Sequence, residues 1–180
     1  KTRWAFNPTT MGAPPAQARD ISVSHIGGLH SNRVAQLNAL SQVHSGIEVY
    51  REIPYDVVKS VWARSHFSLC LTMNALMTLR QTKGRIVEIP NFCPLLTEPF
   101  PTLDLYYKED EVILFHSIEE AQEKINFYLN NDDEHKALFD RGRRALWERN
   151  TAYHEWNEIL PKIDPTYKRK NVTEMLNEHH

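Results

Sequence analysis

The sequence predicts an α/β domain in which a parallel sheet is flanked by helices. Three observations lead to this prediction. Short apolar runs alternate with amphipathic stretches of about ten residues, glycine and proline mark the junctions, and the alternation continues along most of the chain. Strands that alternate with helices in this way build parallel sheets with crossover connections.

Composition is that of one ordinary globular domain. The chain has 180 residues, of which 41% are hydrophobic and 24% charged. A net charge of -2 provides no general basic field for nucleic acid or anionic membranes, so any phosphate binding must be local. No signal-like start and no apolar run of the roughly 18 residues of a membrane span is found, so a cytoplasmic protein is expected. Cys70 and Cys93 lie in apolar runs and are expected to be reduced core thiols.

Three segments are expected along the chain. Residues 1–19 are rich in proline and small residues and predict an extended arm or linker, whose apolar part is Trp4 to Phe6. This arm is either a connection from a preceding domain or a remnant that packs on the surface. Residues 20–163 form the domain, and residues 164–180 form a polar tail whose final His179-His180 is typical of a purification tag.

The first strand is expected over Ile21 to Ile26, directly before Gly27-Gly28. A helix then begins at Ser31, a good N-cap residue, and extends to about Val43. In this arrangement backbone N–H groups and the positive end of a helix can receive a phosphate. An ordinary tight turn is the alternative, because Gly-Gly lacks the full dinucleotide-binding fingerprint.

A second strand is expected over residues 47–50, followed by a helix after Ile53-Pro54-Tyr55 and a third strand over residues 66–71. Residues 75–82 fit either a helical turn or a loop that orders on a ligand. Ligands of parallel sheets bind outside the carboxyl ends of the strands. Those ends are expected at Gly27-Gly28, at residues 52–55 and 72–74, and at Thr97-Glu98.

The central stretch from Lys83 to Phe115 predicts a short helix over residues 85–89 and two buried strands, Cys93 to Thr97 and Glu111 to Phe115. Ser117 and Glu120 have the spacing of a capping box at the start of a helix. Three helices are expected to complete the domain, over residues 117–129, from Asp132 or Asp133 to Trp147, and over residues 153–160.

This order of elements resembles the C-terminal domain of glycosyltransferases with the GT-B fold, which has two facing Rossmann-like domains, and within them the CgeB-like group. The similarity covers roughly residues 20–163. The residues that carry it are Arg85 to Glu88, Leu95-Leu96-Thr97-Glu98, Pro101, Leu103, Glu111-Val112, Phe115, Glu119-Glu120, Lys124-Ile125, Arg141-Gly142-Arg143 and Thr151-Ala152-Tyr153.

The resemblance implies the donor-binding half of a glycosyltransferase, which transfers a sugar from a UDP- or GDP-linked donor to an unknown acceptor. The acceptor and the catalytic base would come from an N-terminal domain or a partner chain, and no residue here matches them. No cofactor is expected. Asp-x-Asp, the motif of metal-dependent transferases, is absent, and His25, His30, His44 and His66 show no zinc-like spacing, so no metal site is expected.

Seven residues are expected at the donor site. Glu88 matches the family glutamate that holds the nucleotide ribose, although Arg80 stands where retaining enzymes have a first glutamate. Lys83 and Arg85 would stabilise the charge that develops on the diphosphate. The remaining candidates are Gly27, Gly28 and Arg33 for the diphosphate and Tyr55 for the nucleobase. A solvated or simply packed side chain is the alternative for each.

Two other functions are compatible with the pattern. One is a non-catalytic interaction module that keeps the Rossmann-like shell and uses the Trp4–Phe6 arm, Trp147 and Trp156 as an interface. The other is a response-regulator-like or flavodoxin-like domain. The lack of an acidic cluster after the first strand counts against the response-regulator-like domain, and no feature of the sequence supports the flavodoxin-like one. Nucleotide affinity separates the transferase from the interaction module.

Overall fold

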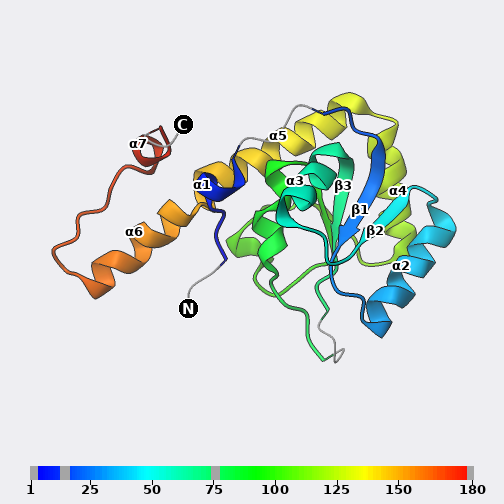
Figure 1. The fold of residues 1–180 in the computed structure, drawn as a ribbon, viewed down its shortest axis with the longest axis horizontal. Coiled ribbons are helices and arrows are strands. Elements are labelled where there is room, and N and C mark those ends of the chain that lie inside the picture. The colour runs from blue at the N-terminus through cyan, green and yellow to red at the C-terminus, as the bar shows by residue number, and fades with distance from the viewer. Residues whose placement is uncertain (1–3, 13–16, 74–77, 178–180) are drawn as a thin grey trace.

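The computed structural model describes residues 4–12, 17–73 and 78–177, and within them a five-stranded parallel sheet of order β2-β1-β3-β4-β5 forms the centre (Figure 1). The strands are β1 (Ile21–Ile26), β2 (Ile47–Tyr50), β3 (Ser65–Cys70), β4 (Leu95–Thr97) and β5 (Ile113–Leu114). The register places Val23 of β1 opposite Ile47 of β2 and Phe67 of β3. The predicted α/β architecture with a parallel sheet is therefore confirmed.

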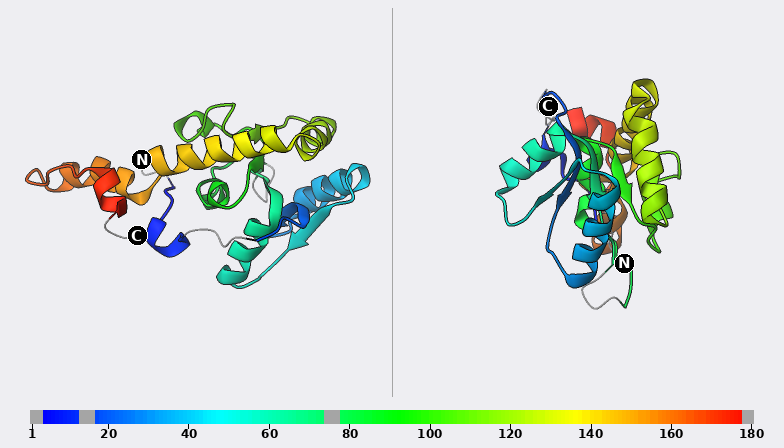
Figure 2. Two further views of the ribbon diagram at one scale, coloured as in Figure 1. Left: turned by 90° about the horizontal axis from the view of Figure 1, so that it is seen from above. Right: turned by 90° about the vertical axis from the view of Figure 1, so that its right-hand side faces the viewer.

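Helices cover both faces of the sheet. The helices of the described residues are α1 (Pro8–Met11), α2 (Ser31–Val43), α3 (Tyr55–Arg64), α4 (Ile118–Leu129), α5 (Asp132–Arg149), α6 (Ala152–Ile163) and α7 (Val172–Asn177), with 3₁₀ turns η1 (Gly84–Val87), η2 (Ile89–Asn91) and η3 (Leu103–Leu105). Helices α6 and α7 project away from the sheet at the end of α5 (Figures 1 and 2).

Each face of the sheet has its own apolar core. On one face, α3 and the 3₁₀ turns bury Trp62, Ile86 and Phe92. On the other face, α2 and α4 bury Leu40 and Ile125. The central strands are covered on both sides, and their buried serines bond to one another: Ser24 Oγ donates to Ser68 Oγ at 3.1 Å and Ser65 Oγ donates to Ser24 Oγ at 2.8 Å. Each large side chain fully buried in these cores stabilises the fold by about 1.5–3 kcal/mol.

Several predicted elements have different limits in the structure. The third strand begins one residue earlier, at Ser65. Strand β4 begins only at Leu95, because η2 and the bonds from the Phe92 and Cys93 N–H groups to the Ile89 carbonyl hold the preceding residues in turns. The predicted short helix over residues 85–89 is formed by two 3₁₀ turns, η1 and η2, and the second continues past the predicted end to Asn91. Strand β5 is reduced to two residues.

The segment over residues 75–82, for which the sequence allowed either a helical turn or a loop, is only partly described. Residues 74–77 lie outside the described residues. Of the remainder, Arg80 forms an isolated antiparallel bridge with Met73, and the Gln81 N–H donates to the Thr72 carbonyl at 2.9 Å. The described part of the segment is therefore extended and not helical.

Two predicted helix caps are wrong, and the third is confirmed in part. His30 precedes α2 without a side-chain cap, so Ser31 is the first helical residue. Asn131 occupies the N-cap of α5, which places Asp132 and Asp133 in the first turn, where negative charge is favourable. Ser117 Oγ does accept from the Glu120 N–H at 3.2 Å, as predicted. The Glu120 carboxylate, however, accepts from the N–H of His116 and completes no capping box.

Residues 4–12 are attached to the domain. Phe6 is fully buried, its N–H donates to Asn150 at 2.7 Å, and its carbonyl accepts from the Ala152 N–H at 2.6 Å. Its ring contacts Trp147 edge-on, with the centroids 5.2 Å apart. Trp147 also donates to Asn91 Oδ1 at 3.1 Å, so it belongs to the core region. The predicted domain limits at residues 20 and 163 stay a prediction.

The structure bears on two further predictions, the state of the cysteines and the lack of a membrane span. Cys70 and Cys93 are both buried and form no disulfide, as expected. Among the described helices, none is long and apolar enough to cross a membrane. The cytoplasmic location stays a prediction.

Candidate functional site

A cavity lies at the point where the strand order of the sheet reverses. The chain adds β2 on one side of β1 and then β3 on the other, so the carboxyl ends of β1 and β3 are the topological switch at which open α/β sheets bind ligands. A cavity of about 430 Å³ opens there. Its lining comes from both strand ends and from the start of η1: His25, Ile26, Gly28, His30, Arg33, Leu69, Cys70, Leu71, Lys83, Gly84, Arg85 and Glu88.

A second cavity, of about 440 Å³, lies on the β2 side of the first. Its lining includes Ile53 and Val58 from the β2–α3 connection and α3. The two cavities share four lining residues: Ile26, Gly28, His30 and Arg85. Arg85 therefore borders both spaces.

Arg85 extends over the end of β1. A Cβ on Gly27 would stand 2.7 Å from Arg85 Nη1, so a larger residue at this position would displace the guanidinium from its present place. Within the described residues, no hydrogen bond or ion pair engages the Arg85 side chain. The half-buried cation is thus available to an anion that enters either cavity.

Two further donors lie near Arg85. Lys83 Nζ donates to Gln81 Oε1 at 2.6 Å, and burial together with nearby Arg33 lowers the pKa of Lys83. Helix α2 begins at this edge of the sheet. No side chain caps its N-terminus, so no capping side chain occupies the N–H groups of its first turn. The Gly27 N–H, in contrast, donates to the Tyr50 carbonyl at 3.0 Å and belongs to the sheet.

Glu88 connects η1 to η2 and lines the first cavity. Burial raises the pKa of its carboxyl group, while Arg85 acts in the opposite direction. The Tyr55 hydroxyl donates to Glu88 Oε1 at 3.4 Å and also contacts Met11 Sδ. Burial and the Glu88 charge raise the pKa of Tyr55 to about 12, so the hydroxyl keeps its proton at neutral pH. Tyr55 lines neither cavity.

Arg33 is at the first cavity, but its terminal nitrogens are engaged by the protein. Nη1 donates to the Gly28 carbonyl at 3.0 Å and Nη2 to the Met73 carbonyl at 3.3 Å. The side chain is 8% exposed. Arg33 thereby ties the turn after β1 to the turn after β3, and it adds positive charge to the cavity wall.

Sequence reasoning missed Glu98 as the partner of Arg80. The Glu98 carboxylate is buried at the end of β4, where Oε1 lies 2.6 Å from Arg80 Nη1. It also accepts from the Thr72 N–H at 3.0 Å and from Gln36 Nε2 at 2.9 Å. Arg80 therefore lies outside the first cavity and holds the segment after β3 in place.

The sequence also gave no role to His25, which lines the first cavity with 3% of its surface exposed. Its Nδ1 lies 2.9 Å from the Leu69 carbonyl oxygen. A histidine inside a buried strand, two residues before Gly27, was the available signal. Its significance depends on β1 and β3 being neighbours, which the sequence pattern did not specify.

A family model described as glycosyl transferase-like matches residues 16–161 of the sequence. The chain belongs to this glycosyl transferase-like family. Among curated proteins, none matches it.

Solved structures resemble this glycosyl transferase-like chain at low sequence identity. TarM shares 9% identity over 86% of this chain and 37% of its own, with a TM-score of 0.62. Anabaena Alr3699/HepE, solved with UDP and glucose, shares 10% over 82% and 49%, with a TM-score of 0.65. Sucrose-phosphate synthase from Thermosynechococcus elongatus shares 12% over 80% and 37%, with a TM-score of 0.54.

These likenesses confirm the predicted fold, a Rossmann-like domain of the GT-B type. The glycosyl transferase-like chain spans less than half the length of each of the three proteins. The narrower likeness to the CgeB-like group and the roles of the seven predicted site residues stay predictions. Within the described residues, no three His, Cys, Asp or Glu side chains gather as a metal site would require.

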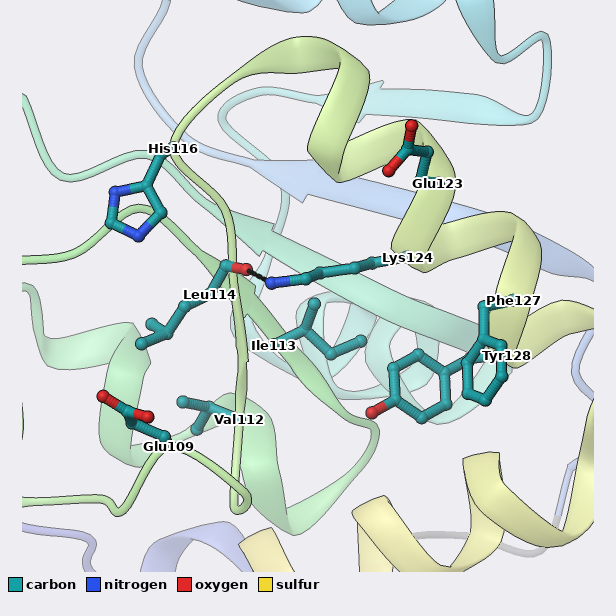
Figure 3. Close-up of a pocket in the computed structure, with 9 residues that line it drawn as sticks. All are labelled: Glu109, Val112, Ile113, Leu114, His116, Glu123, Lys124, Phe127 and Tyr128. Carbon is teal, nitrogen blue, oxygen red and sulfur yellow. Dashed lines mark hydrogen bonds between the residues drawn. The ribbon is translucent and has the colours of Figure 1, made fainter.

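A larger cavity, of about 530 Å³, lies beside the edge strand β5 and helix α4 of this glycosyl transferase-like domain (Figure 3). Lys124 Nζ donates to the Leu114 carbonyl and to Glu120 Oε1, both at 2.6 Å. The bond to Leu114 satisfies a carbonyl of the edge strand and so hinders the addition of another strand. None of the predicted site residues lines this cavity.

Proposed function

We propose that the chain is the donor-binding domain of a glycosyltransferase that transfers a sugar from a UDP- or GDP-linked donor to an acceptor held by another domain or a partner chain. The observation that carries the proposal is the position of Arg85. Its guanidinium lies at the topological switch between two cavities, over Gly27, and no described residue forms a hydrogen bond or ion pair with it. Family membership supports the same function.

In this proposal Arg85 and Lys83 bind the diphosphate. The bond between the anomeric carbon and the β-phosphate oxygen breaks, the nucleoside diphosphate leaves with the bonding electrons, and the acceptor oxygen forms the new bond. Negative charge on the diphosphate grows in the transition state, so fixed cations stabilise the transition state more than the bound donor. Arg85 offers a planar fork and Lys83 a point charge, and together with the α2 N-terminus they are proposed to act without a metal ion.

Glu88 is proposed to accept hydrogen bonds from the ribose hydroxyls. The bond from Tyr55 to Glu88 supports a positioning role for Tyr55, in place of the direct nucleobase contact predicted from the sequence. The second cavity is proposed to take the base, because Ile26, Ile53 and Val58 provide an apolar wall next to Arg85. The general base of the transfer is proposed to lie on the acceptor-binding part.

Thermal unfolding with added nucleotides tests the proposal. A ligand that binds only the native state raises the midpoint, and one present at 100 times its Kd adds about 2.7 kcal/mol. UDP, GDP and ADP would each be tested with and without magnesium. We expect a magnesium-independent shift with UDP or GDP that Arg85→Ala abolishes. If neither nucleotide shifted the midpoint, the proposal would be wrong.

Helix α6 supports a second candidate function, a non-catalytic interaction module. Trp156 is 51% exposed and Ile163 72% exposed on this helix, which projects from the domain (Figure 1). Trp147 does not contribute to such a surface, because it packs against Phe6. The module would bind a protein through α6 and no nucleotide, so the unfolding experiment separates it from the transferase.

A further inference from the structure

His25 has a fixed tautomer at the wall of the first cavity. A carbonyl oxygen only accepts hydrogen bonds, so the 2.9 Å contact with Leu69 requires the proton on Nδ1. Burial lowers the pKa of His25 to about 4; the Leu69 bond opposes this effect, and Arg33 and Arg85 add to it. The ring is thus neutral at pH 7, and Nε2 carries a bare lone pair.

That lone pair is buried without a partner. Among the described residues, none donates a hydrogen bond to His25 Nε2, which has almost no exposed surface. A buried acceptor left unpaired costs about 1–3 kcal/mol. Such atoms are rare in native proteins and often occur where function requires them.

The guanidinium of Arg85, whose N–H groups have no acceptor among the described residues, borders the same glycine as His25 Nε2. The point at which a Cβ on Gly27 would stand is 2.7 Å from Arg85 Nη1 and 3.5 Å from His25 Nε2, so both nitrogens approach the same face of Gly27. A guanidinium carries five N–H donors, and no described residue accepts from those of Arg85. An unused acceptor and an unused donor therefore border the same point beside Gly27.

We propose that His25 is a positioning residue for Arg85, whose guanidinium donates one N–H to His25 Nε2 while its other N–H groups bind the diphosphate of the donor. This inference rests on the proposed function. A neutral acceptor suits this role because it orients the guanidinium without cancelling its charge. A carboxylate at the same place would orient Arg85 equally well, but it would neutralise the cation that the diphosphate requires.

Two substitutions separate the acceptor from the rest of the ring. His25→Asn keeps an N–H donor near the position of Nδ1, for the Leu69 carbonyl, and removes the acceptor at Nε2. His25→Gln places an amide oxygen near the position of Nε2. We expect His25→Asn to weaken binding of UDP or GDP about tenfold, which corresponds to about 1.4 kcal/mol. Binding of the parent nucleoside should be unchanged, and His25→Gln should recover most of the lost affinity.

Titration calorimetry measures these affinities, and thermal unfolding reports whether each variant folds. A double-mutant cycle then tests the route through Arg85. In the Arg85→Ala background, His25→Asn should have no further effect on diphosphate binding. Additive losses would mean that His25 contacts the ligand directly, and the inference would be overturned.

The remaining outcomes separate this inference from the proposed function. If the unaltered chain bound the diphosphate and His25→Asn bound it equally well, the positioning role would be wrong and the proposed function would stand. If the unaltered chain bound neither UDP nor GDP, the proposed function itself would be wrong.

Discussion

Arg85 Nη1 lies 2.7 Å from the point at which a Cβ on Gly27 would stand. The space beside Gly27, directly after β1, is thus occupied by the guanidinium of a residue almost sixty positions later in the chain. This contact brings a residue after β3 onto the end of β1, at the boundary of two cavities. The size of the side chain at position 27 therefore affects where the Arg85 guanidinium can lie.

Gly27→Ala is expected to displace the guanidinium. The end of an arginine side chain moves easily, so the free energy of unfolding should change by less than about 1 kcal/mol. Affinity for UDP or GDP should fall about 10- to 100-fold, because one charge-assisted interaction is worth roughly 1.5–3 kcal/mol. Titration of the diphosphate and of the parent nucleoside measures the effect, and the nucleoside is the control. Equal losses for both ligands would contradict the explanation.

Glu88→Gln is expected to separate binding from stability. Affinity for the nucleoside diphosphate should fall by about 1 to 3 kcal/mol, because the ribose hydroxyls lose a charged acceptor. The pKa of Glu88 is raised by burial, so the folded state binds this proton more tightly than the unfolded state, and the contribution of Glu88 to stability falls as the pH rises through that range. The variant should therefore be more stable at neutral pH.

Calorimetry and thermal unfolding measure the two properties of Glu88→Gln separately. Nucleotide affinity of the unaltered chain should also decrease as the pH falls through the raised pKa of Glu88, since the protonated carboxyl group is a weaker acceptor. The glutamine variant should lack this dependence. Unchanged donor affinity in the variant would remove Glu88 from the site.

Glu98 is expected to contribute stability that acid removes. Burial alone would raise its pKa, but hydrogen bonds from Arg80, Thr72 and Gln36 outweigh burial, and the pKa is lowered. Stability from Glu98 is therefore present above the ordinary glutamate pKa of about 4.3 and is lost as the pH falls through the lowered value. Glu98→Gln should cost about 1–3 kcal/mol at pH 7 and should flatten the acid limb of the stability curve.

A matched control for Glu98 is the exposed pair of Lys136 and Asp140, which has the same 2.6 Å separation on the surface of α5. Asp140→Asn should change the free energy of unfolding by no more than about 0.5 kcal/mol, because exposed ion pairs contribute little. Denaturant unfolding at several pH values measures both variants. Equal costs for the two substitutions would show that burial of Glu98 is irrelevant.

Gly142→Ala is expected to destabilise the protein. In an ordinary helix this change is favourable by about 0.5–1 kcal/mol. Here the new Cβ would stand 2.5 Å from the backbone oxygen of Glu111, and neither backbone can yield easily. We expect a net cost of about 1–3 kcal/mol, as for other overpacked sites. Denaturant unfolding measures it, and nucleotide affinity at the opposite strand ends should be unchanged. A gain in stability would contradict the close contact.

Local patterns predicted the elements well and their limits less well. The apolar run of β1 and the amphipathic face of α4 specify a strand and a helix through neighbouring residues alone. Strand β4 is shorter than predicted because the Cys93 N–H bonds to the Ile89 carbonyl in a turn. This turn packs against α3 and α5, and that packing stabilises it. Phe6 joined the core for a similar reason, since Asn150 and Ala152 offer it backbone partners.

The sequence by itself determined the alternation of strands and helices, the glycine pair after β1, and the presence of Glu88, Lys83 and Arg85 in one short segment. These features depend on residues close together in the chain, whose spacing and chemistry act locally. Only the tertiary structure decided that Arg85 covers Gly27, that Arg80 pairs with Glu98, and that His25 faces the same point as Arg85. Each of these contacts joins distant residues. The contacts at Gly27 exist because the sheet places β3 beside β1, and the Arg80–Glu98 pair exists because it places β4 beside β3; no local pattern encodes either neighbour.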